Sequence, residues 1–319
     1  MISASAKRRT LRARENRDGL VLLAPTLLVV LAVVVLPILW TVVLAFQRIR
    51  LIDIQRTGLF EAYTLRNFAV VLGSPGFWSS LWTTAAYAVG GTVLSLALGL
   101  VAALALRKPF RGRALLRGAM LLPYVAPVVA VAFVWEVMLS PQYGIVNDWG
   151  VRLLGWDEPI AFLTDRQAEL SVLGLQIPIP VALLTVIVFE GWRYFPFAFL
   201  FLLARIQAVP HDLEEAAVVD GAAPTQRFRH IIWPQLAPVL GLLAMLRFVM
   251  NFNKFDDVYL LTGGGAGTDV ASVRVYDFLT ARFDVGAASA QALVLAAVLL
   301  VFLAVYLKFF APAGEGEER

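Results

Sequence analysis

The sequence predicts an all-α membrane protein that crosses the bilayer six times. Hydrophobic residues make up 60% of its 319 residues and charged residues only 16%, and the mean hydropathy is +0.76. A soluble domain carries more charge than this, because its surface faces water. Several apolar runs also reach the roughly 20 residues with which a helix crosses a hydrocarbon core. These runs are continuously apolar rather than alternating, which disfavours a transmembrane β-barrel.

Six segments have the length and composition of membrane spans. They are Leu20–Phe46, Trp82–Leu106, Leu115–Leu139, Pro180–Ala204, Gln235–Phe255 and Ala287–Phe310. The first is too long for the apolar core of a signal peptide and has no clear cleavage site, so it is counted as a span. Prolines recur in the spans, where each removes a backbone donor and favours a kink. Such kinks fit either ordinary packing geometry or helices that bend around a central pathway.

Basic residues gather in three of the segments outside the spans. The N-terminal tail carries Lys7, Arg8, Arg9, Arg12, Arg14 and Arg17. The links after the second and fourth spans carry Arg107, Lys108, Arg111, Arg113, Arg117, Arg205, Arg227 and Arg229. Residues 140–179 are acidic instead, and the bias is less clear for residues 47–81, which carry Arg48, Arg50, Arg56 and Arg66. By the positive-inside rule, both termini and the two basic links are expected in the cytosol.

The composition argues against several other classes of function. The chain has no cysteine and only two histidines, His211 and His230, so disulfides and thiolate metal sites are excluded and a zinc site is disfavoured. Nucleic-acid binding is disfavoured because the basic residues cluster at membrane borders. No nucleophile–base pair or metal cluster stands out that would make the chain an enzyme.

A glycine-rich run over Gly263–Gly267 invites comparison with a phosphate-binding loop. It lacks the Lys-Ser/Thr end that holds phosphates and magnesium, and the predicted topology places it outside. We therefore interpret it as an outer loop. No cofactor is expected on this chain, and any ATP chemistry must belong to another chain.

A polar, alanine-rich segment over residues 210–234 separates the fourth and fifth spans. Pro210 suits a first helical turn, and negative charge follows near the positive end of the helix dipole, at Asp212, Glu214 and Glu215. A small, mildly apolar face is formed by Leu213, Ala216 and Ala217. Gly221 is expected to end this helix, Pro224 to open a second one, and Pro234 to mark the entrance to the next span.

This segment could lie on the membrane surface or bind another protein. Helices that lie on membranes are usually rich in lysine and carry bulky apolar anchors. The segment over residues 210–221 is acidic and rich in alanine instead, and its small side chains allow close approach. We therefore predict a surface on which a protein partner docks.

The spacing within this segment resembles the EAA loop of binding-protein-dependent ABC importer permeases. Glu215-Ala216-Ala217 is followed after three residues by Gly221, then after nine by Ile231, and after one more by Trp233-Pro234. The one departure is Trp233, where the family usually has leucine. Two further stretches resemble the carbohydrate-importer branch, namely Phe252–Gly265 and Gly144–Asn147. The resemblance covers residues 20 to 310 and points to the maltose and glycerol-3-phosphate type, most like the first permease subunit of trehalose importers.

The resemblance implies a type I ABC importer permease fold with a cytoplasmic coupling helix, in the cytoplasmic membrane of a bacterium or archaeon. It divides the chain into a basic tail over 1–18, a first helix and outer loop over 19–71, the permease domain over 72–311 and a tail over 312–319. It implies a second, homologous permease subunit, two cytosolic ATPase subunits that bind ATP and Mg, and an external sugar-binding protein or lipoprotein. Coupling to the ATPase would involve Glu214, Glu215, Ala216, Ala217, Asp220, Gly221, Ile231 and Pro234.

Ionisable residues within spans cost roughly 2.5–3.5 kcal/mol each to insert and are therefore candidates for function. They are Glu136, Glu190, Arg193 and Arg247. Glu190 and Arg193 lie three residues apart on one helix, so we expect them to pair with each other. Arg247 has no evident partner on its own helix and is expected to pair with a carboxylate from another span.

A sugar pathway needs aromatic platforms for the apolar faces of the rings and polar side chains for the hydroxyl groups. Both kinds occur on the fourth span and after the fifth, at Trp192, Tyr194, Phe195, Asn251, Asn253, Asp256 and Asp257. The alternative for each is an aromatic belt at the membrane interface or a helix cap. The expected substrate is trehalose or a maltose-type oligosaccharide, with glycerol-3-phosphate or a glycerophosphodiester as the alternative. An ion-coupled secondary transporter is less favoured, because no internal repeat is visible.

Overall fold

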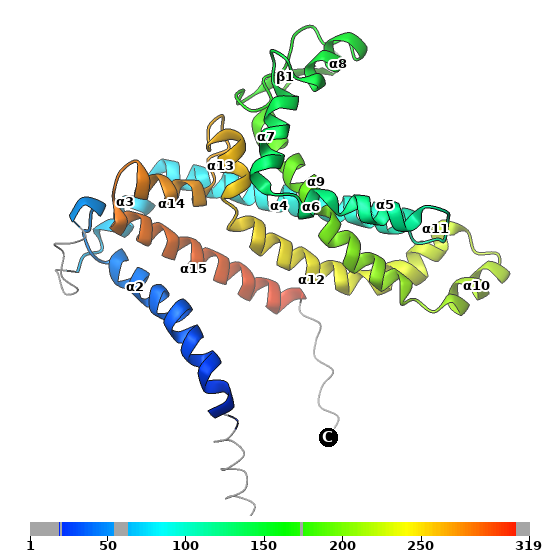
Figure 1. Cartoon of the computed structure of the whole chain (residues 1–319), viewed down its shortest axis with the longest axis horizontal. Helices are drawn as coiled ribbons and strands as arrows, with labels where there is room; N and C mark the ends of the chain where they lie inside the picture. The colour runs from blue at the N-terminus through cyan, green and yellow to red at the C-terminus, as the bar shows by residue number, and fades with distance from the viewer. Residues whose placement is uncertain (1–18, 20, 54–62, 173–174, 311–319) are drawn as a thin grey trace, which may run out of the picture. The chain divides into compact units, whose positions relative to one another are not determined.

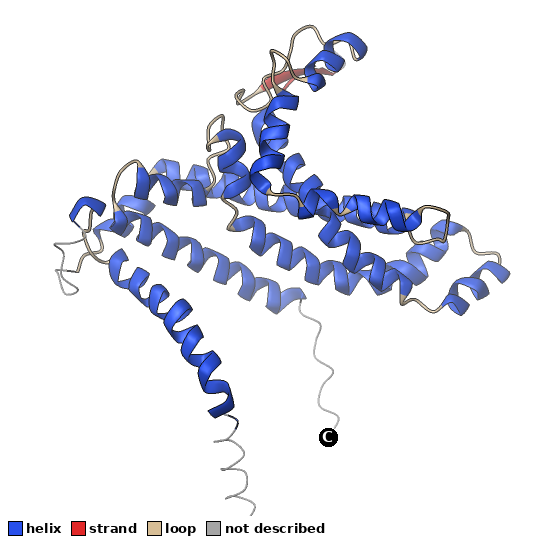
Figure 2. Cartoon of the chain, viewed as in Figure 1, coloured by secondary structure: helices blue, strands red, loops and turns tan. Residues whose placement is uncertain are grey.

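The computed structural model describes residues 19, 21–53, 63–172 and 175–310 of the chain, and Figures 1 and 2 show that these are mostly helical. The elements are a π-helix η1 (Leu31–Val35), α2 (Leu36–Ala45), a 3-10 helix η2 (Leu51–Asp53), α3 (Arg66–Leu72), α4 (Pro75–Ala105), α5 (Arg113–Met120), α6 (Leu122–Val125), α7 (Val128–Leu139), α8 (Ile145–Leu153), β1 (Ala168–Val172), β2 (Leu175–Ile179), α9 (Val181–Gln207), α10 (His211–Val219), α11 (Pro224–Arg227), a π-helix η3 (Phe228–Ile232), α12 (Trp233–Phe252), α13 (Asp256–Thr262), α14 (Ala271–Thr280) and α15 (Val285–Phe310). The two predicted tails, over 1–18 and 312–319, and Arg56 lie outside the described residues.

The predicted six-span class is confirmed, with a difference in the third span. Five helices among the described residues are long and apolar enough to cross a membrane, and a sixth span arises if Arg113–Val125 and Val128–Leu139 are taken together. These two pieces are bent by 94°. The reason is local: Ala126 has extended dihedral angles, as expected for a residue that precedes a proline, here Pro127.

The fourth and fifth spans are longer than the sequence suggested. A single helical run of 29 residues extends from Pro224 to Phe252, so the short helix that begins at Pro224 continues into the span instead of ending before it. The π-helical turn η3 lies directly before Trp233 and Pro234. Pro234 therefore lies inside a continuous helical run rather than at its entrance.

The helices α4 and α9 pack closely along much of their length because α4 carries small residues at every fourth position. Gly91, Ser95, Gly99 and Ala103 are all buried. A β-carbon added at Gly99 would lie 2.6 Å from the Ala198 side chain and 2.9 Å from the Phe199 backbone nitrogen. Such repeats of small residues let the backbones of membrane helices approach one another.

Two apolar clusters flank the middle of α9. One joins the ends of α4 and α9 to the start of α12, and consists of Ala102, Ala103, Leu106, Ala198, Phe199, Leu202, Leu203, Ile206, Ile232, Leu236 and Leu243. The other joins α4, α7, α9, α13 and α14, and consists of Tyr87, Ala132, Val186, Phe189, Val258, Leu261, Val270 and Val273. The C-terminal half of α15 is linked to α12 by the stacked rings of Phe248 and Phe302, 3.9 Å apart.

The described residues of Met1–Val71 and Phe278–Val294 belong to a separate compact unit. The side-chain nitrogen of Asn67 donates to the carbonyl oxygens of Ala45 and Gln47, both at 2.8 Å. The backbone of Leu51 donates to Phe283 at 2.8 Å, and that of Val285 to Ile49 at 3.0 Å. These bonds tie the end of α2 to α3 and to the start of α15.

The segment between α7 and α9 holds α8 and an antiparallel hairpin of β1 and β2, in which Ala168 lies opposite Ile179. Asn147, from one of the two stretches that resemble carbohydrate importers, organises this segment. Its amide nitrogen donates to the carbonyl of Ile160 at 3.0 Å, and its amide oxygen accepts from the Ile160 backbone at 2.7 Å. The buried Asn147 therefore has a structural role in the loop fold.

Candidate functional site

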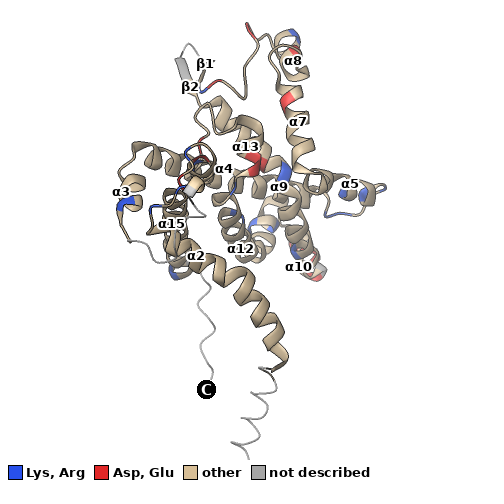
Figure 3. Ribbon diagram, turned by 60° about the vertical axis from the view of Figure 1, so that its left-hand side comes forward, with Lys and Arg blue, Asp and Glu red and all other residues tan. Residues whose placement is uncertain are grey.

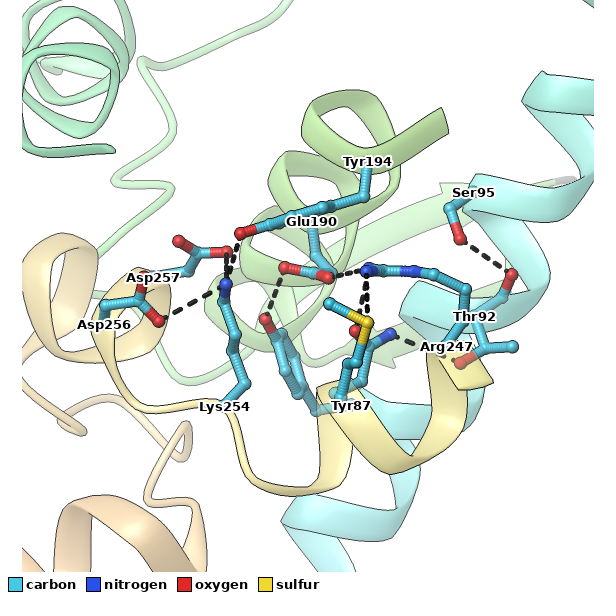
Figure 4. Close-up of polar contacts among 11 residues, drawn as sticks. Tyr87, Thr92, Ser95, Glu190, Tyr194, Arg247, Lys254, Asp256 and Asp257 are labelled. Carbon is cyan, nitrogen blue, oxygen red and sulfur yellow. Dashed lines mark hydrogen bonds and ion pairs between the residues drawn. The ribbon is translucent and has the colours of Figure 1, made fainter. Parts of the chain in front are cut away.

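A buried polar cluster lies between the two apolar clusters, where α4, α9 and α12 meet the start of α13 (Figure 4). Its charged centre is the ion pair between Arg247 on α12 and Glu190 on α9, whose side chains are 1% and 0% exposed. The Tyr87 hydroxyl on α4 donates to the second Glu190 oxygen at 3.0 Å. Three helices are thus connected through one carboxylate in an apolar surrounding, where such a pair is screened little by water.

Asn251 extends the same cluster along α12. Its side-chain oxygen accepts from the Arg247 guanidinium at 2.8 Å, and its nitrogen donates to the Thr92 hydroxyl on α4 at 3.3 Å. Arg247 and Asn251 lie one helical turn apart, so both side chains point to the same side of α12. The side-chain oxygen and nitrogen of Asn251 are thus both bonded to residues of this chain, Arg247 and Thr92.

Lys254 forms the second half of the cluster, in the turn between α12 and α13. Its ammonium group donates to the Tyr194 hydroxyl, and it lies 3.3 Å from Asp256 and 3.4 Å from Asp257. The Lys254 nitrogen also lies 4.3 Å from the Tyr194 ring centre, and the Arg247 guanidinium lies at the same distance. Both cations thus lie within cation–π distance of the Tyr194 ring, which is favourable for each of them.

Electrostatics keep Lys254 charged. Burial alone would lower the pKa of its ammonium group, but the Asp257 and Glu190 carboxylates outweigh burial and raise the pKa. Burial and the neighbouring Glu190 raise the pKa of Asp257, and Lys254 opposes this effect. Asp256 differs from Asp257 because its side chain is 45% exposed. A cation and an accessible carboxylate therefore lie side by side next to an aromatic ring.

The structure brings together four of the seven residues predicted for a substrate pathway: Tyr194, Asn251, Asp256 and Asp257. It places the other three elsewhere. Trp192 contacts Trp135, with ring centres 5.5 Å apart and ring planes tilted by 47°, and Phe195 packs against the apolar cluster at the ends of α4 and α9. Asn253 is exposed and donates to the Val249 carbonyl at 2.9 Å, which is the helix-cap alternative.

Of the predicted ion pairs of the intramembrane charges, one is confirmed and one is wrong. Arg247 pairs with a carboxylate from another span, as predicted. The predicted pair of Glu190 and Arg193 is wrong: Arg193 instead donates to the Ala126 carbonyl at 3.1 Å, at the break between α6 and α7. Glu190 and Arg193 are both buried but bind different partners, because the broken third span offers a free carbonyl. Glu136 lies exposed on α7.

Sequence reasoning missed Tyr87, Thr92 and Lys254. Tyr87 and Thr92 lie in an apolar helix where a hydroxyl carries no sign of its partner, since Glu190 and Asn251 are more than a hundred residues away in the sequence. Lys254 was recognisable, because a lysine within the stretch Phe252–Gly265 lies next to Asp256 and Asp257. A basic residue among acidic ones at the end of a span was a sufficient signal.

The predicted docking segment forms α10, which begins at His211 directly after Pro210 and has Asp212 and Glu214 in its first turn. None of its described side chains, Asp212 to Val219, is buried. Gly221 has φ +77°, a left-handed conformation that ends the helix and favours glycine. Figure 3 shows acidic residues in red on α10.

The later residues of the segment lie on the helix that runs from Pro224. Ile231 is half-buried and belongs to η3, and Pro234 is exposed near the start of α12. Asp220 caps the end of α10 and is exposed. Six of the eight residues predicted for coupling therefore lie on two helices, and Asp220 and Gly221 form the turn between them.

The described part of the chain contains no group of three or more His, Asp or Glu side chains that could hold a metal ion. Among the buried charges, Arg247 pairs with Glu190 and Asp257 lies next to Lys254, whereas Arg193 donates to a backbone carbonyl. A bundle of membrane helices with an organised polar centre and an exposed polar helix between two spans defines a multi-pass permease.

Comparisons with known proteins identify the kind of permease. Residues 95–313 match the family described as "Binding-protein-dependent transport system inner membrane component", and the chain belongs to this family. It is therefore a permease subunit of an ABC importer rather than an enzyme.

The chain is similar to the trehalose/maltose transport system permease protein MalF of Thermococcus litoralis, with 33% identity over 299 residues, 93% of this chain and 95% of the relative. It is also similar to the inner membrane ABC transporter permease protein YcjO of Escherichia coli, with 36% identity over 286 residues, 89% of this chain and 91% of the relative. A solved bacterial ABC transporter involved in import of the acidic polysaccharide alginate has the same fold, with a TM-score of 0.77 and 22% identity, over 94% of this chain and 97% of that chain.

Proposed function

We propose that this chain is the permease subunit that forms one half of the translocation pathway of an ATP-driven sugar importer. The observation that carries the proposal is α10, a helix without a buried described side chain, inserted between two spans of a binding-protein-dependent permease. The substrate is trehalose or a maltose-type oligosaccharide. The name of the Thermococcus litoralis relative supports this class of substrate.

The proposed assembly contains a second, homologous permease, two cytosolic ATPase subunits that bind ATP and Mg, and an external binding protein. It lies in the cytoplasmic membrane of a bacterium or archaeon, with both termini in the cytosol. The regions are the tail over 1–18, the first helix and outer loop over 19–71, the permease domain over 72–311 and the tail over 312–319. Basic residues next to the ends of α4 and α9 support this orientation.

In this proposal α10 is the coupling helix that sits in a cleft of the ATPase. The exposed Glu215 and Ala216 form the contact face, and the left-handed Gly221 permits the turn toward α11. ATP binding draws the two ATPases together and moves the spans from an inward-facing to an outward-facing arrangement, a rigid-body switch.

The substrate pathway is proposed to pass Tyr194, Lys254 and Asp256. An aromatic ring flanked by a cation and a half-exposed carboxylate offers both an apolar face and hydrogen-bonding groups to a sugar. Asp257 contacts Lys254, and Asn251 binds Arg247, which lies against the Tyr194 ring. Both side chains are fully buried. Glycerol-3-phosphate or a glycerophosphodiester is the alternative substrate.

The proposal is tested by sugar uptake into cells or proteoliposomes that contain the complete complex. We expect uptake of labelled trehalose or maltose to stop when the associated ATPase is inactivated by substitution of its phosphate-binding lysine. Uptake that continues without ATP hydrolysis and follows an ion gradient would instead establish a secondary transporter. The ligand that raises the melting temperature of the external binding protein identifies the substrate.

Replacing Asp256 with alanine is expected to lower the uptake rate about tenfold, because it removes the accessible carboxylate next to Lys254 and Tyr194. Uptake is measured at saturating ATP with the amount of assembled complex determined in parallel. Asp277→Asn is the control, since Asp277 is an exposed acidic residue on α14. An unchanged uptake rate for Asp256→Ala would remove this residue from the pathway.

A further inference from the structure

The coupling helix α10 is not held in place by a hydrophobic core. Its described side chains are exposed except for Glu214 and Ala217, which are half-buried. These two residues lie three positions apart and therefore share one face of the helix. This inner face is turned toward the rest of the chain, whereas Glu215 and Ala216 lie on exposed positions.

An ion pair connects the inner face of α10 to the end of α4. The Arg107 guanidinium lies 3.1 Å from the Glu214 carboxylate, and the two side chains are 21% and 20% exposed. Arg107 follows the last residue of α4, Ala105, by two positions. Partial burial on both sides makes this contact stronger than an exposed surface pair.

The backbone that carries Arg107 is itself fixed by two arginines of α5. The Arg117 guanidinium donates to the carbonyl oxygen of Leu106 at 2.8 Å, and that of Arg113 donates to the carbonyl of Arg107 at 3.5 Å. Leu106 is buried in the apolar cluster shared with α9. Arg107 is therefore anchored at its backbone and binds α10 with its side chain.

The ion pair bridges a region where the two elements are not closely packed. A cavity of about 440 Å³ lies there, and it is lined by Arg107, Lys108, Glu214, Glu215, Val218, Val219 and Arg227. Apolar contact alone would transmit force poorly across such a space. A charged contact between two anchored groups can hold α10 at a defined distance from α4.

The helix α4 then leads from this contact to the buried polar cluster. Thr92 and Tyr87 on α4 bond to Asn251 and Glu190, and the small residues around Gly99 keep α4 tightly packed on α9. A displacement of the α4 end can therefore reach the cluster through one rigid helix.

We propose that Arg107 and Glu214 form the positioning contact through which α10 moves α4. The inference rests on the proposed function, since it takes α10 to be the helix that the ATPase moves. Glu214 thus binds its own chain at Arg107, within the segment that is proposed to dock on the ATPase. When this contact is lost, we expect ATP to be hydrolysed without a movement of α4.

The test measures sugar molecules imported per ATP hydrolysed, in proteoliposomes with the complete complex and its binding protein. Arg107→Glu is expected to lower this ratio roughly fivefold with ATPase activity retained, the change that about 1 kcal/mol produces. Glu214→Arg is expected to lower the ratio by a similar factor. The double variant that exchanges the two charges is expected to recover the ratio. Lys108→Glu is the control, because it makes the same charge change on an exposed neighbour that lines the same cavity.

A second pair of variants keeps the test decisive if charge reversal impairs assembly. The chain contains no cysteine, so Arg107→Cys with Glu214→Cys introduces its first two thiols. The ratio is expected to fall in the reduced protein, to recover with a reducible bifunctional thiol reagent, and to fall again on reduction, with the cysteine-free chain as control.

Two results would overturn the inference while leaving the proposed function intact. One is a wild-type ratio in both single charge reversals; the other is a ratio in the exchanged or cross-linked variant as low as in the single ones. Failure of the wild-type complex to couple uptake to ATP hydrolysis would instead overturn the proposed function.

Discussion

Replacing Arg247 with methionine is expected to destabilise the permease by about 3–5 kcal/mol, the cost of leaving one partner of a buried ion pair without its counter-charge. Glu190 is fully buried, and it also accepts a hydrogen bond from the Tyr87 hydroxyl. Asn251 would also lose the guanidinium that binds its oxygen. We expect less assembled complex in the membrane and a lower melting temperature of the complex purified in detergent.

A matched double variant separates the lost charge from the lost packing. Glu190→Gln in the Arg247→Met background removes the unpaired charge, and the glutamine can still accept the hydrogen bond from Tyr87. Buried pairs are often replaced by uncharged residues at little cost, so the double variant should regain most of the stability. The assignment fails if Arg247→Met has the melting temperature of the wild type, or if the double variant is no more stable than the single one.

The spans could be predicted from the sequence because hydropathy is a local property. The apolar composition of a run such as Val285–Phe310 identifies it as a membrane span, whatever the run packs against. A kink near Ala126 could also be predicted, since Pro127 disfavours a helical conformation of its predecessor. The continuation of the helix through Pro234 could not, because a proline within an apolar pattern usually marks the start or the end of a helix, whereas here the helical run extends from Pro224 to Phe252.

The docking segment and the buried polar cluster differ in how far they could be predicted, because only the docking segment depends on local sequence. The docking segment was predictable as a helix with a glycine stop, since its signals lie within twelve residues of one another, from Pro210 to Gly221. The buried cluster was not, because Glu190 had a plausible partner on its own helix and an actual partner 57 residues away. Local spacing favours Arg193, whereas the packing of α4, α9 and α12 selects Arg247.

The difference between local sequence and packing also applies to Glu214 and its neighbour Glu215. They are adjacent in the sequence and both lie in the acidic first half of α10, so the sequence assigns them to one docking surface. On a helix, neighbouring residues point about 100° apart, and the structure turns Glu214 toward Arg107. A surface that binds a partner and a contact that holds the helix can therefore share one short segment.

Replacing Gly99 with alanine is expected to destabilise the permease by about 1–3 kcal/mol, the usual cost of an overpacked contact. The added carbon would lie 2.6 Å from the Ala198 side chain and 2.9 Å from the backbone nitrogen of Phe199. The second neighbour belongs to the main chain of α9 and cannot rotate away, so α4 and α9 must separate. The separation would also pull Thr92 from Asn251, and we expect a lower melting temperature together with slower uptake.

Gly118→Ala is the matched control, because this glycine also lies in a helix and a β-carbon there meets nothing within 4 Å. Alanine favours a helix over glycine by about 1 kcal/mol, so the same substitution should stabilise α5 slightly while it destabilises the contact of α4 with α9. Opposite shifts of the melting temperature are thus expected for two chemically identical changes. If both variants become more stable, helix propensity outweighs packing at Gly99, and the close approach of α4 and α9 is not what requires glycine there.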